Sequence, residues 1–244
     1  MRAVFVNGRF LAQRTTGVQR YAGALLQALD ERFVSAPPTP PWTLLLPMGV
    51  EPPPLRAIGH RHVGWGGPGG LHGWEQCAFP RAGRGGTLLS LAGAAPAGPR
   101  HQACVMHDAA VFDVPGAYGL AFRTWYRWLF RRLARHAALP ITVSAFSRAR
   151  LAAATGVVED RFALVPGGGD HLACVAPGLL PAGVGPRFVL AVASLNPTKN
   201  LARLVAAWAR LGRTDAQLVM VGGDRKSTRL NSSHEWISRM PSSA

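Results

Sequence analysis

Residues 3–33 read AVFVNGRFLAQRTTGVQRYAGALLQALDERF, and the hydrophobic period changes within this stretch. The short apolar run Ala3–Val6 predicts a buried strand. After a polar loop, apolar residues recur every three or four positions, which predicts a helix with Thr15 or Thr16 as its N-cap. These apolar positions are Val18, Tyr21, Ala22, Leu25, Leu26, Leu29 and Phe33. A strand followed by an amphipathic helix is the repeating element of α/β proteins.

The same alternation continues along the chain. Further strands are predicted at residues 43–46, 87–91, 103–106, 140–143, 162–165, 187–193 and 217–221, and further helices at 122–133, 144–154 and 200–211. Alternation of this kind is typical of parallel sheets covered by helices. We therefore expect an α/β protein with a Rossmann-like parallel sheet.

Two changes in the pattern of predicted elements divide residues 1–223 into three segments. Residues 1–166 form the first expected domain. Residues 167–186, which begin with three glycines, read as an interdomain linker. Residues 187–223 then contain one strand-helix-strand unit, which predicts the start of an incomplete second Rossmann-like domain.

The composition changes again near Asp224. Residues 1–224 contain five serines, whereas the last twenty residues contain six. Two stretches, Asp224–His234 and Ser238–Ala244, resemble the translation of a short-read sequencing adapter. We therefore expect residues 224–244 to be disordered and foreign to the native gene; a native polar tail is the alternative.

The formal net charge is +15, and two of the 27 basic residues are lysines, which leaves 25 arginines. Abundant Arg, Ala, Gly and Pro with little Lys is typical of GC-rich genes, so part of this charge reflects codon usage. The remainder suits polyphosphate ligands or anionic membrane surfaces, and no nucleic acid is expected as a partner. No apolar run approaches the roughly 18 residues of a membrane span. Three scattered cysteines predict neither a disulfide framework nor a zinc site, and favour the cytoplasm.

Seven short stretches in order resemble retaining glycosyltransferases of the group 1 (family 4) type. They are Asn7–Phe10, Thr16–Tyr21, Trp74–Gln76, Val105–Asp108, Thr142–Arg148, Val165–Asp170 and Phe188–Asn200. The resemblance spans residues 3–223 and implies a GT-B fold of two Rossmann-like domains. It also implies transfer of a sugar from a nucleotide diphosphate sugar to a glycan or lipid-linked acceptor, in cell-envelope polysaccharide synthesis and without a cofactor. The enzyme would then act in the cytoplasm or at the inner face of the membrane, and the truncated chain would be inactive.

Candidate site residues in the first domain lie where strands end and helices begin. Gly17 and Val18 open a helix, where free backbone N–H groups can hold a phosphate or an acceptor; a simple glycine turn is the alternative. His107 closes a strand, and the resemblance implies a catalytic role in placing the acceptor or stabilising developing charge. A structural histidine is the alternative. Asp108 is a polar partner or a helix cap.

In the second domain, Lys199 precedes a helix, and the resemblance implies that it neutralises the departing diphosphate. Ser194 is the second residue expected to contact the donor diphosphate. Ser194 and Thr198 stand where many members of that family carry arginine. Histidines 60, 62, 72 and 101 have no ordered ligand spacing, so no metal is expected. Ser144 and Ser147 read as helix caps.

Two other functions were weighed. A non-enzymatic basic module would bind anionic membrane or nucleic acid, and the Trp125/Trp128 helix with its arginines is the segment that would touch a membrane. A dinucleotide enzyme is disfavoured because no Gly-x-Gly-x-x-Gly motif follows Ala3–Val6.

Overall fold

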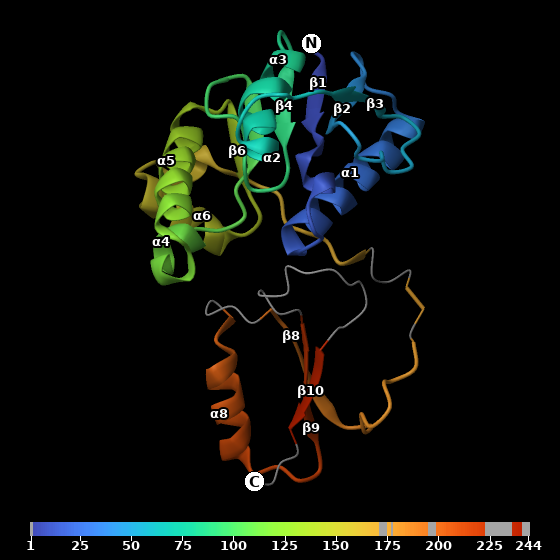
Figure 1. The fold of residues 1–244 in the computed structure, drawn as a ribbon, viewed down its shortest axis with the longest axis vertical. Helices are drawn as coiled ribbons and strands as arrows, with labels where there is room; N and C mark the ends of the chain where they lie inside the picture. Colours follow the sequence, from blue (N-terminus) through green and yellow to red (C-terminus); the bar gives the residue numbers. More distant parts are fainter. Residues whose placement is uncertain (1, 171–174, 177, 195–198, 223–235, 241–244) are drawn as a thin grey trace. The chain divides into compact units, whose positions relative to one another are not determined.

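The computed structural model describes residues 2–170, 175–176, 178–194, 199–222 and 236–240 (Figure 1). These residues divide into two compact units. The first contains residues up to 113 and 120–174, and the second contains residues 114–119 and 175–244. The division at residue 174 falls inside the segment predicted to be a linker.

The first unit is built around a seven-stranded sheet in which every strand pair is parallel. Its strands are β1 (Val4–Asn7), β2 (Trp42–Pro47), β3 (Gly59–Val63), β4 (Thr87–Ser90), β5 (Gln102–Val105), β6 (Leu139–Thr142) and β7 (Ala163–Leu164). They lie in the order β3-β2-β1-β4-β5-β6-β7. The first six strands follow the Rossmann order, so the predicted α/β class with a Rossmann-like parallel sheet is confirmed.

Helices connect these strands and flank the sheet (Figure 1). They are η1 (Gly8–Ala12), α1 (Gly17–Ser35), α2 (Gly70–Gly73), the π-helical η2 (Trp74–Ala78), α3 (Phe79–Ala82), α4 (Ala110–Asp113), α5 (Leu120–His136), α6 (Ala145–Thr155) and η4 (Glu159–Arg161). Two predicted caps are confirmed: Thr16 precedes α1 and Ser144 precedes α6. The Ser144 hydroxyl accepts a hydrogen bond from the Ser147 backbone N–H at 3.0 Å, which satisfies one orphan donor of the helix.

Both faces of the sheet are buried because side chains on each strand alternate. Leu44 and Leu46 of β2 pack into one apolar cluster with Val6 and Leu26. Leu45, between them, packs on the opposite face in a second cluster whose other members include Trp74 and Phe79. The near-continuous apolar strands seen in the sequence are thereby explained.

The structure departs from the sequence prediction at β3. No strand was predicted at residues 59–63, but His60, Arg61 and His62 lie in the outer strand beside β2. All three side chains are exposed, so the strand forms through backbone pairing to β2 and carries no apolar signal.

The second unit contains a three-stranded sheet of order β10-β9-β8. Strand β8 (Phe188–Val192), helix α8 (Leu201–Leu211) and the parallel strand β9 (Gln217–Gly222) form the predicted strand-helix-strand unit. The second compact unit also includes the short helix η3 (Pro115–Ala117). Strand β10 (Trp236–Met240) pairs antiparallel with β9, which differs from the expectation of a tail without regular structure. A strand edge offers unpaired N–H and C=O groups to any extended segment, whatever its side chains. The rest of residues 223–244 lies outside the described residues.

Candidate functional site

The central crossing point of the first sheet lies between β1 and β4. From β1 the chain runs outward to β2 and β3, and it then crosses to β4 on the other side. In open α/β sheets, ligands bind beyond the carboxyl ends of the strands at such a switch point. Here those ends carry Asn7 on β1, Ser90 on β4 and, just after β5, His107.

His107 is held by the neighbouring strand end. Its Nε2 lies 3.0 Å from the carbonyl oxygen of Leu91. A carbonyl only accepts, so Nε2 carries the proton and Nδ1 is the ring nitrogen with an open lone pair. Burial lowers the pKa of His107, opposed by the Leu91 hydrogen bond and the nearby Asp108 charge. The imidazole is therefore neutral at pH 7 and can accept a hydrogen bond at Nδ1.

Asp108 is exposed, and its carboxylate accepts a hydrogen bond from the backbone N–H of Ala110 at 2.9 Å. It therefore caps the start of α4, the second of the two roles weighed from the sequence. It also contributes the negative charge beside His107.

Gly17 opens α1 at the edge of a cavity of about 540 Å³. Lining residues include Gly17, Arg20, Tyr21, Pro166, Gly167, Gly168 and Asp170. A Cβ atom placed on Gly17 would meet nothing within 4 Å, so the helix start is open to a ligand. Val18 is half-buried and does not line this cavity.

Tyr21 connects this cavity to His107. Its ring contacts the imidazole edge-on, with 4.9 Å between ring centroids. Its hydroxyl donates to the carbonyl of Val165 at 3.1 Å. A Cβ on Gly167 would lie 3.1 Å from the Tyr21 ring, so glycine lets this loop approach closely. Tyr21 thus contacts His107 and lines the same cavity as Gly17, and these two predicted site residues are 90 positions apart in the sequence.

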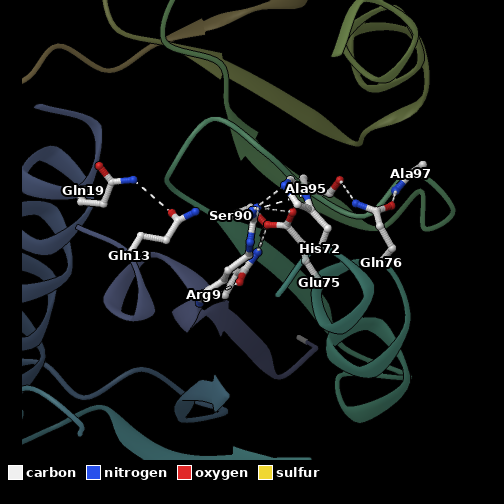
Figure 2. Close-up of polar contacts among 10 residues, drawn as sticks. Arg9, Gln13, Gln19, His72, Glu75, Gln76, Ser90, Ala95 and Ala97 are labelled. Carbon is white, nitrogen blue, oxygen red and sulfur yellow. Dashed lines mark hydrogen bonds and ion pairs between the residues drawn. The ribbon is translucent and has the colours of Figure 1, made fainter. Parts of the chain in front are cut away.

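A buried polar network lies at the same switch point and was not predicted as a site (Figure 2). The carboxylate of Glu75 accepts from Nη1 of Arg9 at 2.7 Å and from Nδ2 of Asn7 at 2.9 Å. Asn7 Nδ2 also contacts the Ser90 hydroxyl at 3.2 Å. Nη2 of Arg9 lies 3.2 Å from Nε2 of His72.

The network is almost entirely withdrawn from water. Glu75 is 2% exposed and Arg9 is 6% exposed. Burial raises the pKa of Glu75, and the Arg9 charge and the Asn7 hydrogen bond oppose that rise. Burial and the Arg9 charge lower the pKa of His72, consistent with a neutral ring that accepts from the guanidinium. Burying an ion pair costs desolvation energy. A pair buried at the sheet edge where such folds bind ligands is therefore a candidate for a role in binding.

The sequence carried a weak signal for this network. Glu75 is an acidic residue between Trp74 and apolar Cys77 and Ala78, on a helical turn with π-type hydrogen bonding. Such turns are frequent at functional sites. Its partner Arg9 is 66 residues away, so the pairing could not be read before the strand order was known.

The predicted residues of the second unit lie around the end of β8. Ser194 follows β8 and is exposed, and Lys199 precedes α8 and is exposed. Thr198 lies outside the described residues. A Cβ on Gly222 would come within 1.8 Å of the Ala193 carbonyl oxygen, so glycine at the end of β9 permits the close approach of the chain after β8.

The arginines of α5 are largely committed to packing. Nε of Arg127 donates to the Val111 carbonyl at 3.0 Å, Nε of Arg132 to the Ala97 carbonyl at 2.6 Å, and Nη2 of Arg135 to the Thr155 carbonyl at 3.1 Å. The helix therefore uses its basic face to bind neighbouring backbone. Trp125 and Trp128 lie beside each other on its exposed part.

The four candidate metal ligands lie apart: His60 and His62 on β3, His72 beside Arg9, and His101 exposed before β5. Among the described residues, no group of three or more His, Cys, Asp and Glu could hold a metal ion. No described helix is long and apolar enough to cross a membrane.

A comparison with models of known protein families gave no match, and a comparison with curated proteins gave none either.

Proposed function

We propose that this chain is part of a retaining glycosyltransferase that moves a sugar from a nucleotide diphosphate sugar to a glycan or lipid-linked acceptor. The observation that carries the proposal is the meeting of His107 and the open start of α1 around Tyr21, at the switch point of a Rossmann-like sheet. Tyr21 contacts His107, a hydrogen-bond acceptor, and lines the cavity at the open start of α1. An acceptor and an anion-binding helix start that share this neighbour suit a ligand with both hydroxyl groups and phosphate.

The proposed chemistry is mostly electrostatic. The bond between the anomeric carbon and the diphosphate oxygen breaks, and its electron pair leaves on the diphosphate. The acceptor hydroxyl forms the new bond on the same face of the sugar, and its proton passes to a diphosphate oxygen. Nδ1 of neutral His107 holds a sugar hydroxyl in place, and the N–H groups at Gly17 attract the phosphate of the ligand. The role of Lys199, in the second unit, is proposed from the resemblance alone: its ammonium would neutralise the charge of the leaving diphosphate.

The test of this proposal is Lys199→Ala in a form of the enzyme that carries a complete second domain. Losing one charged contact to phosphate costs about 1.5–3 kcal/mol, so we expect donor affinity to fall roughly 10- to 100-fold with the fold intact. Calorimetric titration with nucleotide sugars measures the affinity, and circular dichroism checks the fold. Arg210→Ala, at the other end of α8, is the matched control and should leave affinity unchanged.

Two outcomes would count against the proposal. Unchanged donor affinity and turnover in Lys199→Ala would remove this lysine from the site. Steeply salt-dependent binding of nucleic acid or anionic vesicles, with no binding of any nucleotide sugar, would favour a basic binding module instead.

A further inference from the structure

A small cavity adjoins the buried Arg9–Glu75 pair. Its lining residues are Asn7, Arg9, Phe10, Gln13, Glu75, Leu91 and Ala92. Its volume is about 10 Å³, which is close to the least that one water-sized group requires. The cavity therefore takes a single non-hydrogen polar atom.

One donor at this cavity is unsatisfied. Nη1 of Arg9 is bound by Glu75, and Nη2 faces His72. Nε of Arg9 is buried and has no partner among the described residues. A buried donor of a charged group is costly to leave without a partner. We therefore expect a polar atom of a ligand to accept the hydrogen bond from Nε–H of Arg9.

The residues that line the cavity favour one kind of polar group over another. An anion is disfavoured because the Glu75 carboxylate lines the same space. A hydroxyl fits because it can accept from Nε–H of Arg9 and donate to a carboxylate oxygen of Glu75.

Two walls of the cavity are bonded to residues near the predicted site. Leu91, one of its walls, accepts the hydrogen bond from His107. Gln13, another wall, accepts at Oε1 from Nε2 of Gln19 on α1 at 3.0 Å (Figure 2). The cavity thus lies between the end of β4 and the loop that leads into α1.

We propose that this cavity is a hydroxyl subsite, in which one hydroxyl of a sugar ligand bridges Nε of Arg9 and the carboxylate of Glu75. The identification of that ligand as the acceptor rests on the proposed function. This subsite would explain why the ion pair is buried here. Glu75 orients the guanidinium of Arg9 so that its Nε–H faces the ligand, and the Glu75 carboxylate accepts a hydrogen bond from the ligand hydroxyl.

The side-chain Nε–H resonance of Arg9 reports directly on this contact. The ¹⁵N-labelled chain would be titrated with the methyl glycosides of glucose, mannose and galactose. We expect a saturable shift of the Arg9 Nε–H resonance with at least one of them. The control ligand is 2-methoxytetrahydropyran, which keeps the ring and has no hydroxyl, and it should cause no shift.

Two variants separate binding from folding. Arg9→Lys keeps a charge beside Glu75 but removes Nε–H, and we expect glycoside affinity, followed by ligand-observed NMR, to fall about 10-fold. Ala92→Ser adds a single non-hydrogen atom, a hydroxyl oxygen, at the wall of the cavity and keeps both members of the ion pair, so the Arg9 resonance should remain and lose its response. Arg135→Lys, whose guanidinium binds the Thr155 carbonyl, is the matched control and should change neither readout.

An Arg9 resonance that does not move with any glycoside, or that moves equally with the control ring, would overturn the proposal. So would an undiminished response in Ala92→Ser. This readout does not depend on sugar transfer. If the Arg9 resonance shifts with a glycoside but the chain never transfers sugar, the proposed function is wrong and the subsite stands. If the chain transfers sugar but the Arg9 resonance does not shift, the subsite is wrong and the proposed function stands.

Discussion

The Nε2–H group of His107 is committed to the Leu91 carbonyl, and this single contact decides which ring nitrogen a ligand can meet. Protonating the ring would place a positive charge in a buried position, which is why its pKa lies below the ordinary 6.5. The residue is thereby fixed as a neutral hydrogen-bond acceptor at physiological pH.

A pH dependence of stability follows from this depressed pKa. The unfolded chain protonates His107 near pH 6.5, whereas the folded chain protonates it only at lower pH. In that window the unfolded state binds more protons, so the free energy of unfolding is fully retained above pH 6.5 and falls as the pH drops through the folded pKa. His107→Gln, which can still donate to Leu91, should reduce this loss, as measured by urea unfolding at a series of pH values. Part of the slope should remain, because the pKa of His72 is also lowered.

The control for this prediction is His101→Gln, because His101 is exposed before β5. That variant should leave the pH dependence unchanged. An identical slope in His107→Gln and the parent chain would mean that the imidazole is not buried in its neutral form.

Sequence reasoning could place His107 but not its partners. A polar residue directly after a buried strand lies at the carboxyl edge of a parallel sheet, and that much is local information. The Leu91 contact depends on β4 and β5 being neighbours, and the Tyr21 contact depends on where α1 packs. The Arg9–Glu75 pair was missed for the same reason, since no local pattern couples a residue after β1 to a residue on a π-helical turn.

At the scale of elements, Asp30 explains how a polar edge strand is positioned. It lies on α1 with no exposed surface, and its carboxylate accepts the backbone N–H groups of Arg56, Ala57 and Ile58, each at 2.8 Å. This clamp ends one residue before β3 begins at Gly59. The strand is therefore set by its approach and by β2, not by its own side chains.

Asp30→Ala should break the clamp. Three backbone donors would lose their acceptor, and unsatisfied buried donors cost about 1–3 kcal/mol each, so we expect a loss of the order of 3 kcal/mol in the free energy of unfolding. Hydrogen exchange at the amides of Ala57 and Ile58 should accelerate. Glu31→Ala, at the next and exposed position, should change stability by less than about 0.5 kcal/mol.

Unchanged exchange rates at these amides in Asp30→Ala would show that β3 holds itself in place. The clamp also shows the limit of hydrophobic periodicity. The apolar strands β1, β2, β4, β5 and β6 were predicted from their side chains, whereas β3, whose side chains are mostly exposed, was not. Hydrophobic patterns report burial, and an edge strand can form without it.

At the scale of the whole molecule, the two units differ in how well their sheets are covered. In the first unit the central strands are buried on both faces. In the second, Val189, Leu190 and Val192 of β8 are 47%, 53% and 74% exposed. Trp208 is the only buried residue of α8. Parallel sheets are ordinarily covered on both faces, so the exposed apolar side chains of β8 are expected to form a sticky hydrophobic surface that favours association.

The chain of residues 1–244 should therefore not support multiple rounds of sugar transfer. The end of β8 carries Ser194 and is followed by Lys199, both proposed to contact the donor diphosphate, and both are exposed to water. Exposed charges are screened, and water at the reacting carbon competes with the acceptor. The experiment incubates the purified chain with a panel of nucleotide sugars and lipid-linked acceptors, and mass spectrometry follows the products. The expected result is no product beyond a single turnover.

A hydrophobic dye separates this explanation from simple misfolding. If β8 is the exposed apolar surface, a chain shortened to residues 1–174 should bind less dye per molecule while keeping the Arg9 Nε–H resonance of the first unit. Equal dye binding by the two chains would place the exposed surface elsewhere. Robust multiple-turnover transfer by residues 1–244 would show that the uncovered β8 does not limit the chemistry, because an open donor site would then suffice.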